Sequence, residues 1–374
     1  MNHNLKIVFL ILGTILFSQS FTVEATEIPS EEWNLSMGVA DDDYFRGVEQ
    51  TSDGGYIVAG TSESLAEGSK GGKADAWLVK LDKEGNVDWN NTYGENYGEW
   101  GFIAKQTSDG GYALTGYSFP TGPGKDYILK VDKEGNEEWN KIDDEITHDD
   151  YLEYVAERTN DGGYIVADIV EYAKPDPDSF LLSIDMDINL TKYDINGLKE
   201  WNTKFGQETY SEIIDLDSHP VRQTSDNGYV IAGTIVANKS NGYDIWLIKT
   251  DEFGQEQWNK TYGAQKSDSA YCISLTSDNG YVMSGMSSSP KFSGSGGKGF
   301  ILKTDADGNQ EWMVEFSNCT LYSVEQTSDN GYIAAGIKDG RPWVVKLEGD
   351  TAVDEAGNIF SKLWCYVYSF FKYN

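Results

Sequence analysis

Acidic side chains stand at nearly the same place before several copies of a repeated segment. The segment Gln-Thr-Ser-Asp-Gly-Gly-Tyr first occupies residues 50–56, and Asp43 lies seven positions before it. Three more carboxylates lie seven or eight positions before later copies: Glu99, Asp150 and Asp268. Calcium prefers oxygen ligands of this kind. Radial repetition would bring the four acids together at the mouth of a central channel, so they form a candidate calcium site. Capping of turns explains them equally well.

Residues for other chemistry are few. Beyond the first 25 residues the only histidines are His148 and His219. The chain has no Gly-x-Ser-x-Gly elbow, no His-Glu-x-x-His, no Cys-x-x-Cys and no phosphate-binding loop. A glycoside hydrolase needs only two carboxylates, but 61 acidic residues do not single out a pair. We therefore expect a binding protein rather than an enzyme, with no catalytic residue assigned.

The repeated segment itself predicts the architecture. Its six copies occupy residues 50–56, 106–112, 158–164, 223–229, 275–281 and 326–332. Self-similarity at a period near fifty residues is typical of an array of identical units. In the first unit we expect strands at 47–51, 56–61, 76–81 and 87–93, with Asp-Gly-Gly as a tight hairpin turn. Four-stranded units arranged radially are propeller blades. The sequence therefore predicts an all-β, six-bladed β-propeller.

The ends of the chain indicate how the ring closes. The sixth repeat stops after Leu347 without the Trp-Asn strand that ends other repeats. A spare copy, Glu32-Trp33-Asn34, precedes the first full repeat. We expect this N-terminal strand to pair with residues 343–347 as the outer strand of the last blade, which removes an open edge. An open solenoid of six units is the alternative.

Loop lengths differ between the two faces. The hairpins like 52–55 and 83–86 are short and repeat closely, which makes one face uniform. The connections on the other face vary, at residues 62–73, 118–125, 170–177, 236–242 and 287–298. Variable loops on a rigid scaffold are where binding usually occurs. The third repeat is longer, and we place its insertion at 186–191, near the uniform face.

The second hairpin turn carries a family resemblance. Asp82-x-x-Gly85-Asn86-x-x-Trp89 recurs at 132–139 and 305–312, and it resembles the tryptophan-docking motif of quinoprotein-type propellers. The resemblance spans roughly residues 31–350 and extends to secreted bacterial and archaeal proteins with Ser-Asp-Gly-Gly-Tyr repeats. It implies that each tryptophan packs against the next blade. We accordingly expect burial of Trp89, Trp139, Trp201, Trp258 and Trp312. Quinone-dependent dehydrogenases would have vicinal cysteines, and this chain has none, which argues against a quinone cofactor.

The N-terminus predicts export. Lys6, an apolar run at 7–17 and Val23-Glu24-Ala25 form a secretory signal over residues 1–25. The propeller then covers 26–350 as one domain, and an aromatic tail covers 351–374. About thirteen apolar residues in that tail are too few to span a bilayer.

Composition excludes one class of partner. The chain has 61 acidic and 29 basic residues and a formal charge of −32. Nucleic acid is not an expected partner, because binding a polyanion needs a basic face. The three cysteines, Cys272, Cys319 and Cys365, are not a disulfide framework. A bridge between Cys272 and Cys319 and a pair of buried thiols are the two open interpretations.

Together these features predict an exported, monomeric propeller, secreted or at the cell surface. We expect a binding or interaction module, with a surface polysaccharide or a protein as its ligand, no evident cofactor, and calcium as the candidate ion. Two alternatives stay open. One is a carbohydrate-active enzyme that uses paired carboxylates, and the other is a structural component of the envelope.

Overall fold

The computed structural model describes most of the propeller region. The described residues are 28–38, 43–65, 74–94, 98–119, 124–142, 156–175, 182–206, 220–238, 242–263, 267–287 and 297–349. Five features named above lie outside these ranges: the signal at 1–25, the tail at 351–374, Cys365 and the candidate residues His148 and His219. Asp150 lies outside them as well.

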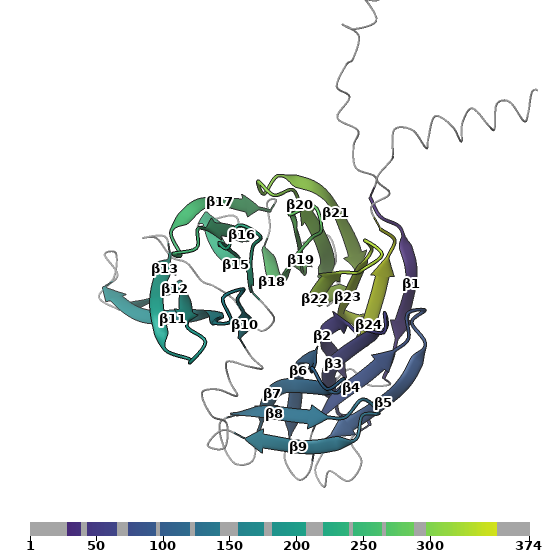
Figure 1. The fold of residues 1–374 in the computed structure, drawn as a ribbon. Helices are drawn as coiled ribbons and strands as arrows, with labels where there is room; N and C mark the ends of the chain where they lie inside the picture. Colours follow the sequence, from purple (N-terminus) through teal and green to yellow (C-terminus); the bar gives the residue numbers. More distant parts are fainter. Residues whose placement is uncertain are drawn as a thin grey trace, which may run out of the picture.

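Within the described residues the strands form six antiparallel sheets of four strands each, arranged radially (Figure 1). Blade 1 contains β2 (Tyr44–Gln50), β3 (Tyr56–Ser62), β4 (Asp75–Leu81) and β5 (Val87–Tyr93). Blade 2 contains β6 (Glu99–Gln106), β7 (Tyr112–Ser118), β8 (Lys125–Val131) and β9 (Glu137–Ile142). Blade 3 contains β10 (Glu157–Arg158), β11 (Tyr164–Pro175), β12 (Leu182–Tyr193) and β13 (Lys199–Phe205).

The remaining blades follow the same order. Blade 4 contains β14 (Val221–Gln223), β15 (Tyr229–Asn238), β16 (Gly242–Thr250) and β17 (Glu256–Tyr262). Blade 5 contains β18 (Asp268–Leu275), β19 (Tyr281–Ser287), β20 (Lys298–Thr304) and β21 (Gln310–Ser317). Blade 6 contains β22 (Cys319–Gln326), β23 (Tyr332–Lys338), β24 (Arg341–Leu347) and β1 (Glu31–Ser36). The first strand of each repeat is innermost (Figure 1), so the predicted fold class, a six-bladed β-propeller, is confirmed.

The N-terminal strand completes the last blade, as predicted. Strand β1 pairs antiparallel with β24, with Ser36 opposite Trp343 and Glu31 opposite Leu347. The ring of Trp33 then lies over Gly85 in blade 1, where an added Cβ would sit 2.8 Å from the indole. One short strand therefore closes blade 6 and contacts blade 1.

The hydrophobic core lies between the blades. Side chains alternate between the two faces of a strand, so each sheet contributes apolar residues to both neighbours. Ile57 and Leu78 of blade 1 are buried in one cluster with Leu114 and Leu129 of blade 2. Further clusters join blade 3 to 4, 4 to 5, 5 to 6 and 6 to 1. Burial on both faces explains why all seven residues of β3 are buried.

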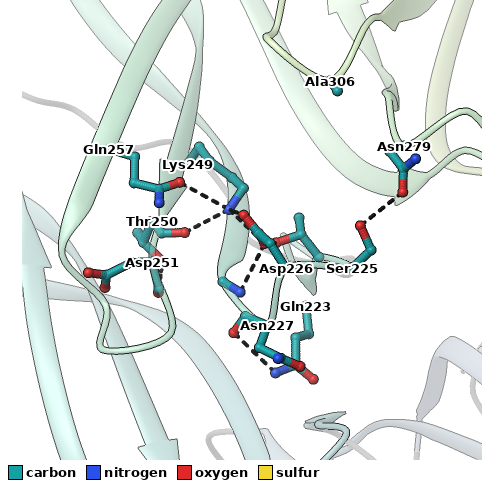
Figure 2. A network of polar contacts seen from close by, with 12 residues as sticks. Gln223, Ser225, Asp226, Asn227, Lys249, Thr250, Asp251, Gln257, Asn279 and Ala306 are labelled. Atoms are coloured by element: carbon teal, nitrogen blue, oxygen red, sulfur yellow. Dashed lines mark hydrogen bonds and ion pairs between the residues drawn. The ribbon is translucent and has the colours of Figure 1, made fainter.

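A buried lysine holds each short hairpin turn. In blade 4, Lys249 Nζ donates to Asp226 Oδ2 at 2.8 Å, to the Thr250 carbonyl at 2.8 Å and to Gln257 Oε1 at 3.3 Å (Figure 2). Every described blade repeats the pair of lysine and turn aspartate: Lys80–Asp53, Lys130–Asp109, Lys192–Asp161, Lys249–Asp226, Lys303–Asp278 and Lys346–Asp329. The Ser-Asp-Gly-Gly segment is therefore a structural motif.

Glutamine side chains connect successive turns on the same face. Gln106 Oε1 of blade 2 accepts from the Ser52 amide of blade 1 at 2.8 Å. Gln50 Oε1 of blade 1 accepts from the Ser328 amide of blade 6 at 2.8 Å, which joins the last blade to the first. The glutamine that opens the repeated segment thus contributes to closure of the ring.

The predicted burial of the outer-strand tryptophans holds for Trp312 only, which is 3% exposed. The described rings of Trp89, Trp139, Trp201 and Trp258 are half-buried. Trp89 does contact the next blade, because its Nε1 donates to the Lys133 carbonyl at 3.3 Å. An outer strand has no further strand beyond it, so one edge of the indole stays in solvent.

Two smaller predictions need correction. The extra length of the third repeat does not form an insertion at 186–191. It extends β11 and β12, which pair continuously from Tyr164–Tyr193 to Pro175–Leu182. Cys272 and Cys319 are both free and buried, so the bridge between them is wrong and buried thiols are what the structure contains. The described part of the chain contains no helix with the length and apolarity needed to cross a membrane.

Candidate functional site

Asp43, the first acid predicted from the sequence, caps a loop of its own blade. It lies directly before β2 and is fully buried. Its Oδ1 accepts from Ser62 Oγ at 2.8 Å, from the Glu63 amide at 2.9 Å and from the Ser64 amide at 3.1 Å. These donors follow β3, so Asp43 fixes the start of the connection between β3 and β4.

The other two described acids stand at different blade boundaries. Glu99 begins β6, and its Oε1 accepts from Ser118 Oγ at 3.0 Å. Asp268 begins β18 and lies close to Asp244 of the preceding blade. Within the described ranges there is no group of three or more His, Cys, Asp or Glu side chains that could hold a metal ion. Asp43, Glu99 and Asp268 therefore do not form one cluster.

A different set of residues meets in the central channel. A cavity of about 270 Å³ there is lined by residues from all six innermost strands. The penultimate residue of each of these strands lines it, and together we call them the channel ring: Glu49, Lys105, Glu157, Arg222, Ser274 and Glu325. Because the six blades surround one axis, equal positions in the repeats become neighbours in space.

A second layer comes from β-bulges in four inner strands. The strand register skips Arg46 between Phe45 and Gly47, and equivalent skips occur at three other blades. A bulged residue is left out of the ladder and its side chain is redirected. The skipped residues, which we call the channel collar, are Arg46, Phe102, Tyr271 and Tyr322. They precede the ring positions by three residues, on the side of the variable loops.

The collar residues of successive blades touch one another. The Arg46 guanidinium lies 5.1 Å from the Phe102 ring centroid and 4.9 Å from that of Tyr322. Tyr322 and Tyr271 have centroids 5.3 Å apart with planes inclined by 32°. Cation–π and offset aromatic contacts of this kind hold the side chains in place. The collar is thus a preformed arc over blades 5, 6, 1 and 2.

On one side of the channel ring a carboxylate lies between two basic groups. Glu157 Oε2 lies 3.7 Å from Arg222 Nη1 and 4.0 Å from Lys105 Nζ. Burial, the largest cause, lowers the pKa of Lys105 from its ordinary value, and Glu157 opposes that effect. This carboxylate therefore connects blades 2, 3 and 4 electrostatically.

On the opposite side two carboxylates are close. Burial raises the pKa of Glu325 to about 7. The backbone amide of Gln50 donates to Glu325 Oε2 at 2.9 Å and opposes part of this rise. Burial also raises the pKa of Glu49, which accepts from the Gln106 amide at 3.3 Å. Glu325 therefore keeps its proton to a higher pH than an ordinary glutamate does.

Sequence reasoning missed both layers, although a signal was present. The ring residues immediately precede the repeated segment, and this position differs from blade to blade while the turn lysines are constant. A position that varies among otherwise similar repeats is not required by the repeated fold. The contrast between the variable channel-ring position and the constant turn lysine therefore distinguishes the candidate site from the structural motif.

A larger hollow belongs to the structural motif instead. It has a volume of about 500 Å³ and lies between blades 1 and 2. Its lining includes Asp53, Lys80 and Gln106, whose side chains already form the ion pair and the turn connection described above. We therefore place the candidate ligand site in the channel.

Comparison with known proteins supplies no family. No protein-family model and no curated protein sequence matches the chain. Among solved structures it is similar to a member of the DUF4221 family from Bacteroides vulgatus, with 10% identity, a TM-score of 0.45 and coverage of 87% of this chain and 99% of that chain. An α-L-arabinofuranosidase from Fusarium graminearum gives 10% identity, a TM-score of 0.46 and coverage of 88% and 99%. Similarity this low identifies no function, and the fold follows from the strand pairing of this chain.

Proposed function

We propose that the protein is an exported binding module that receives the end of a surface polysaccharide in its central channel. The observation that carries this proposal is the mutual contact of collar residues from successive inner strands, three positions before the residues of the channel ring. Aromatic rings offer apolar faces to the C–H side of a sugar, and charged groups form strong hydrogen bonds with its hydroxyls. Small-molecule sites commonly combine aromatic walls with a few convergent polar groups.

The dimensions of the channel favour a chain end over a folded protein. A cavity of about 270 Å³ holds one or two sugar rings. The collar is held by contacts between blades, so little conformational entropy is lost when a ligand binds. Export and a location at the cell surface belong to this proposal, and fractionation of the producing cell tests them.

Binding by collar variants tests the site. Titration calorimetry with oligosaccharides released from the cell-surface polysaccharide should show Tyr322→Ala binding at least about tenfold more weakly than wild type, because stacked aromatic contacts are lost. Phe253→Ala is the matched control, since Phe253 is 63% exposed on a turn outside the channel. Equal affinities of wild type and Tyr322→Ala, with unchanged melting temperatures, would show that the channel is not the site.

A second candidate function follows from Glu325. A carboxylic acid with a pKa near 7 is suited to protonate a glycosidic oxygen at neutral pH. Glu49 of the neighbouring strand then provides the second carboxylate that glycoside hydrolysis requires. A screen with chromogenic glycosides would support this function if turnover occurs and is abolished in both Glu325→Gln and Glu49→Gln. Absence of turnover in wild type leaves the binding module.

A further inference from the structure

Aromatic side chains of blade 2 continue the channel collar toward the variable loops. Trp100 of β6 and Tyr117 of β7 stand opposite each other in the strand register. Phe119 follows β7 directly, and its ring centroid lies 4.9 Å from that of Trp100. The Phe102 ring of the collar lies 5.3 Å from the Tyr117 ring, with planes inclined by 89°. We call Trp100, Tyr117 and Phe119 the aromatic row, and it begins where the collar ends.

Two members of the aromatic row are exposed although their side chains are large and aromatic. Trp100 is 37% exposed and Tyr117 is 42% exposed. Phe119 is half-buried. Residues directly opposite each other on paired strands present their side chains on the same face of the sheet, so Trp100 and Tyr117 form one surface. Adjoining exposed apolar side chains mark interaction sites, whereas single ones are common on any protein surface.

The backbone and a glycine hold the aromatic row in place. The Phe119 amide donates to the Gly98 carbonyl at 2.9 Å. A Cβ on Gly124 would lie 2.7 Å from Phe119 Cε1. Gly124 is not among the described glycines with a positive φ, so its need for glycine comes from the ring and not from the backbone. Phe119 in turn contacts Trp100, and a row held in this way loses little conformational entropy when a ligand binds.

The repeated fold does not require the aromatic row. In each of the four described blades with a bulge, the residue two positions before the bulge faces a residue of the second strand. These opposed pairs are Tyr44–Thr61 in blade 1, Trp100–Tyr117 in blade 2, Ser269–Met286 in blade 5 and Thr320–Ile337 in blade 6. Among these four blades, two aromatic residues oppose each other in blade 2 alone. Blade 2 therefore departs from the other repeats at this place, as the channel ring does at its own position.

We propose that the aromatic row binds the sugar units that precede the polysaccharide end held in the channel. This inference rests on the proposed function and gives the ligand a direction. The cavity of about 270 Å³ holds one or two sugar rings, so the rest of a polysaccharide that enters past the collar must cross the rim. The row continues from the collar at Phe102 and offers apolar ring faces to the C–H side of further sugars. The ligand is therefore a chain of several units that lies over blade 2.

Oligosaccharides of two lengths from the cell-surface polysaccharide of the producing cell test this path by titration calorimetry. Wild type should bind a hexasaccharide more tightly than a disaccharide, because only the longer ligand reaches the aromatic row. Trp100→Thr with Tyr117→Thr removes both rings and uses residues that other blades have there, Thr320 and Thr61. This double variant should bind the hexasaccharide at least about fivefold more weakly than wild type, since stacked contacts are lost. Its affinity for the disaccharide and its melting temperature should be unchanged.

Two further variants separate the aromatic row from the channel. Phe253→Ala removes a ring that is 63% exposed on a turn outside the row, and it should keep both affinities. Tyr322→Ala, in the collar, should weaken the binding of both oligosaccharides. If Tyr322→Ala keeps both affinities, the channel is not the site and the proposed function fails together with this inference.

Other results overturn this inference alone. It fails if Tyr322→Ala weakens both ligands while the double variant binds the hexasaccharide as wild type does, or weakens both ligands equally. The proposed function then stands without the aromatic row. It also fails if light scattering shows that wild type self-associates and the double variant does not, which would make the row a contact between two copies of the chain.

Discussion

At the scale of single residues, the repeats separate structural positions from candidate functional ones. The turn lysine is the same in every described blade, and Lys303 is fully buried between Asp278 and Glu311, both at 2.7 Å. The channel ring has three carboxylates, two basic groups and a serine at one repeat position. The repeated fold requires the turn lysine, but it does not require any particular residue at the channel-ring position. The channel ring is therefore where the chain departs from its own consensus.

The raised pKa of Glu325 predicts a pH dependence of stability. The folded state binds this proton up to about pH 7, whereas an unfolded chain releases it near the ordinary glutamate value of 4.5. The folded state thus binds more protons between these values, so this group lowers stability as pH rises through that interval, by at most about 3 kcal/mol. Glu325→Gln should remove this contribution. In urea unfolding, the variant should gain stability relative to wild type from about pH 5 to about pH 8.

The matched control for this titration is Glu252→Gln, which changes an exposed carboxylate that does not belong to the channel ring. Its stability difference from wild type should stay constant over the same interval. A constant difference for Glu325→Gln as well would mean that Glu325 is ionised like an ordinary surface glutamate.

At the scale of elements, the two positions that follow the aspartate of each hairpin turn have different roles. Gly54 has a φ of 83° and open space around its Cβ position. At the same turn position Asn227 and Asn279 have φ values of 64° and 66°. Gly55 does not have a positive φ, but a Cβ there would lie 2.3 Å from the Leu81 carbonyl oxygen and 2.6 Å from Lys80 Nζ. The first position thus needs a left-handed backbone, and the second needs an absent side chain.

This distinction predicts unequal costs for two adjacent substitutions. Gly54→Asn should change the free energy of unfolding by less than about 1 kcal/mol, because asparagine tolerates the left-handed region. Gly55→Ala should lower it by about 2–3 kcal/mol, because its methyl group meets a backbone carbonyl that cannot move away easily. Urea unfolding of both variants measures the difference. Equal losses would show that the approach of Lys80 and the Leu81 carbonyl is adjustable.

At the scale of the whole molecule, closure depends on a short strand far from its partner in the sequence. Deletion of Glu31–Ser36 removes β1, exposes the edge of β24 and breaks the ion pair of 3.0 Å between Lys346 and Glu32. We expect a markedly lower melting temperature and self-association, because an unpaired strand edge is open to other chains. A chain that begins at residue 30 is the control and should behave as wild type. Calorimetry and light scattering measure both effects. Identical melting of the deletion and the control would mean that the ring does not depend on β1.

The sequence by itself determined the architecture. The six copies of the repeat predicted six blades, and the missing Trp-Asn strand after Leu347 predicted the pairing of Trp33 with the last blade. These features are local: strand alternation, turn residues and repeat length are all visible in a short stretch of chain. The half-burial of Trp89 could not be predicted, because it depends on what covers the outer strand of a blade. The extended hairpin of blade 3 could not be predicted, because it depends on where the pairing of β11 and β12 ends.

Only the tertiary structure decided which side chains meet. The equal sequence offset of Asp43, Glu99 and Asp268 suggested one cluster, yet these described residues form no metal-holding group. Asp43 caps a loop of its own blade, and Glu99 and Asp268 begin inner strands of blades 2 and 5. Glu49 and Glu325 come together although 276 positions separate them, because the ring brings the first inner strand next to the last. A repeat specifies where a residue sits in its own blade, whereas the direction of its side chain depends on bulges and on the adjoining blade.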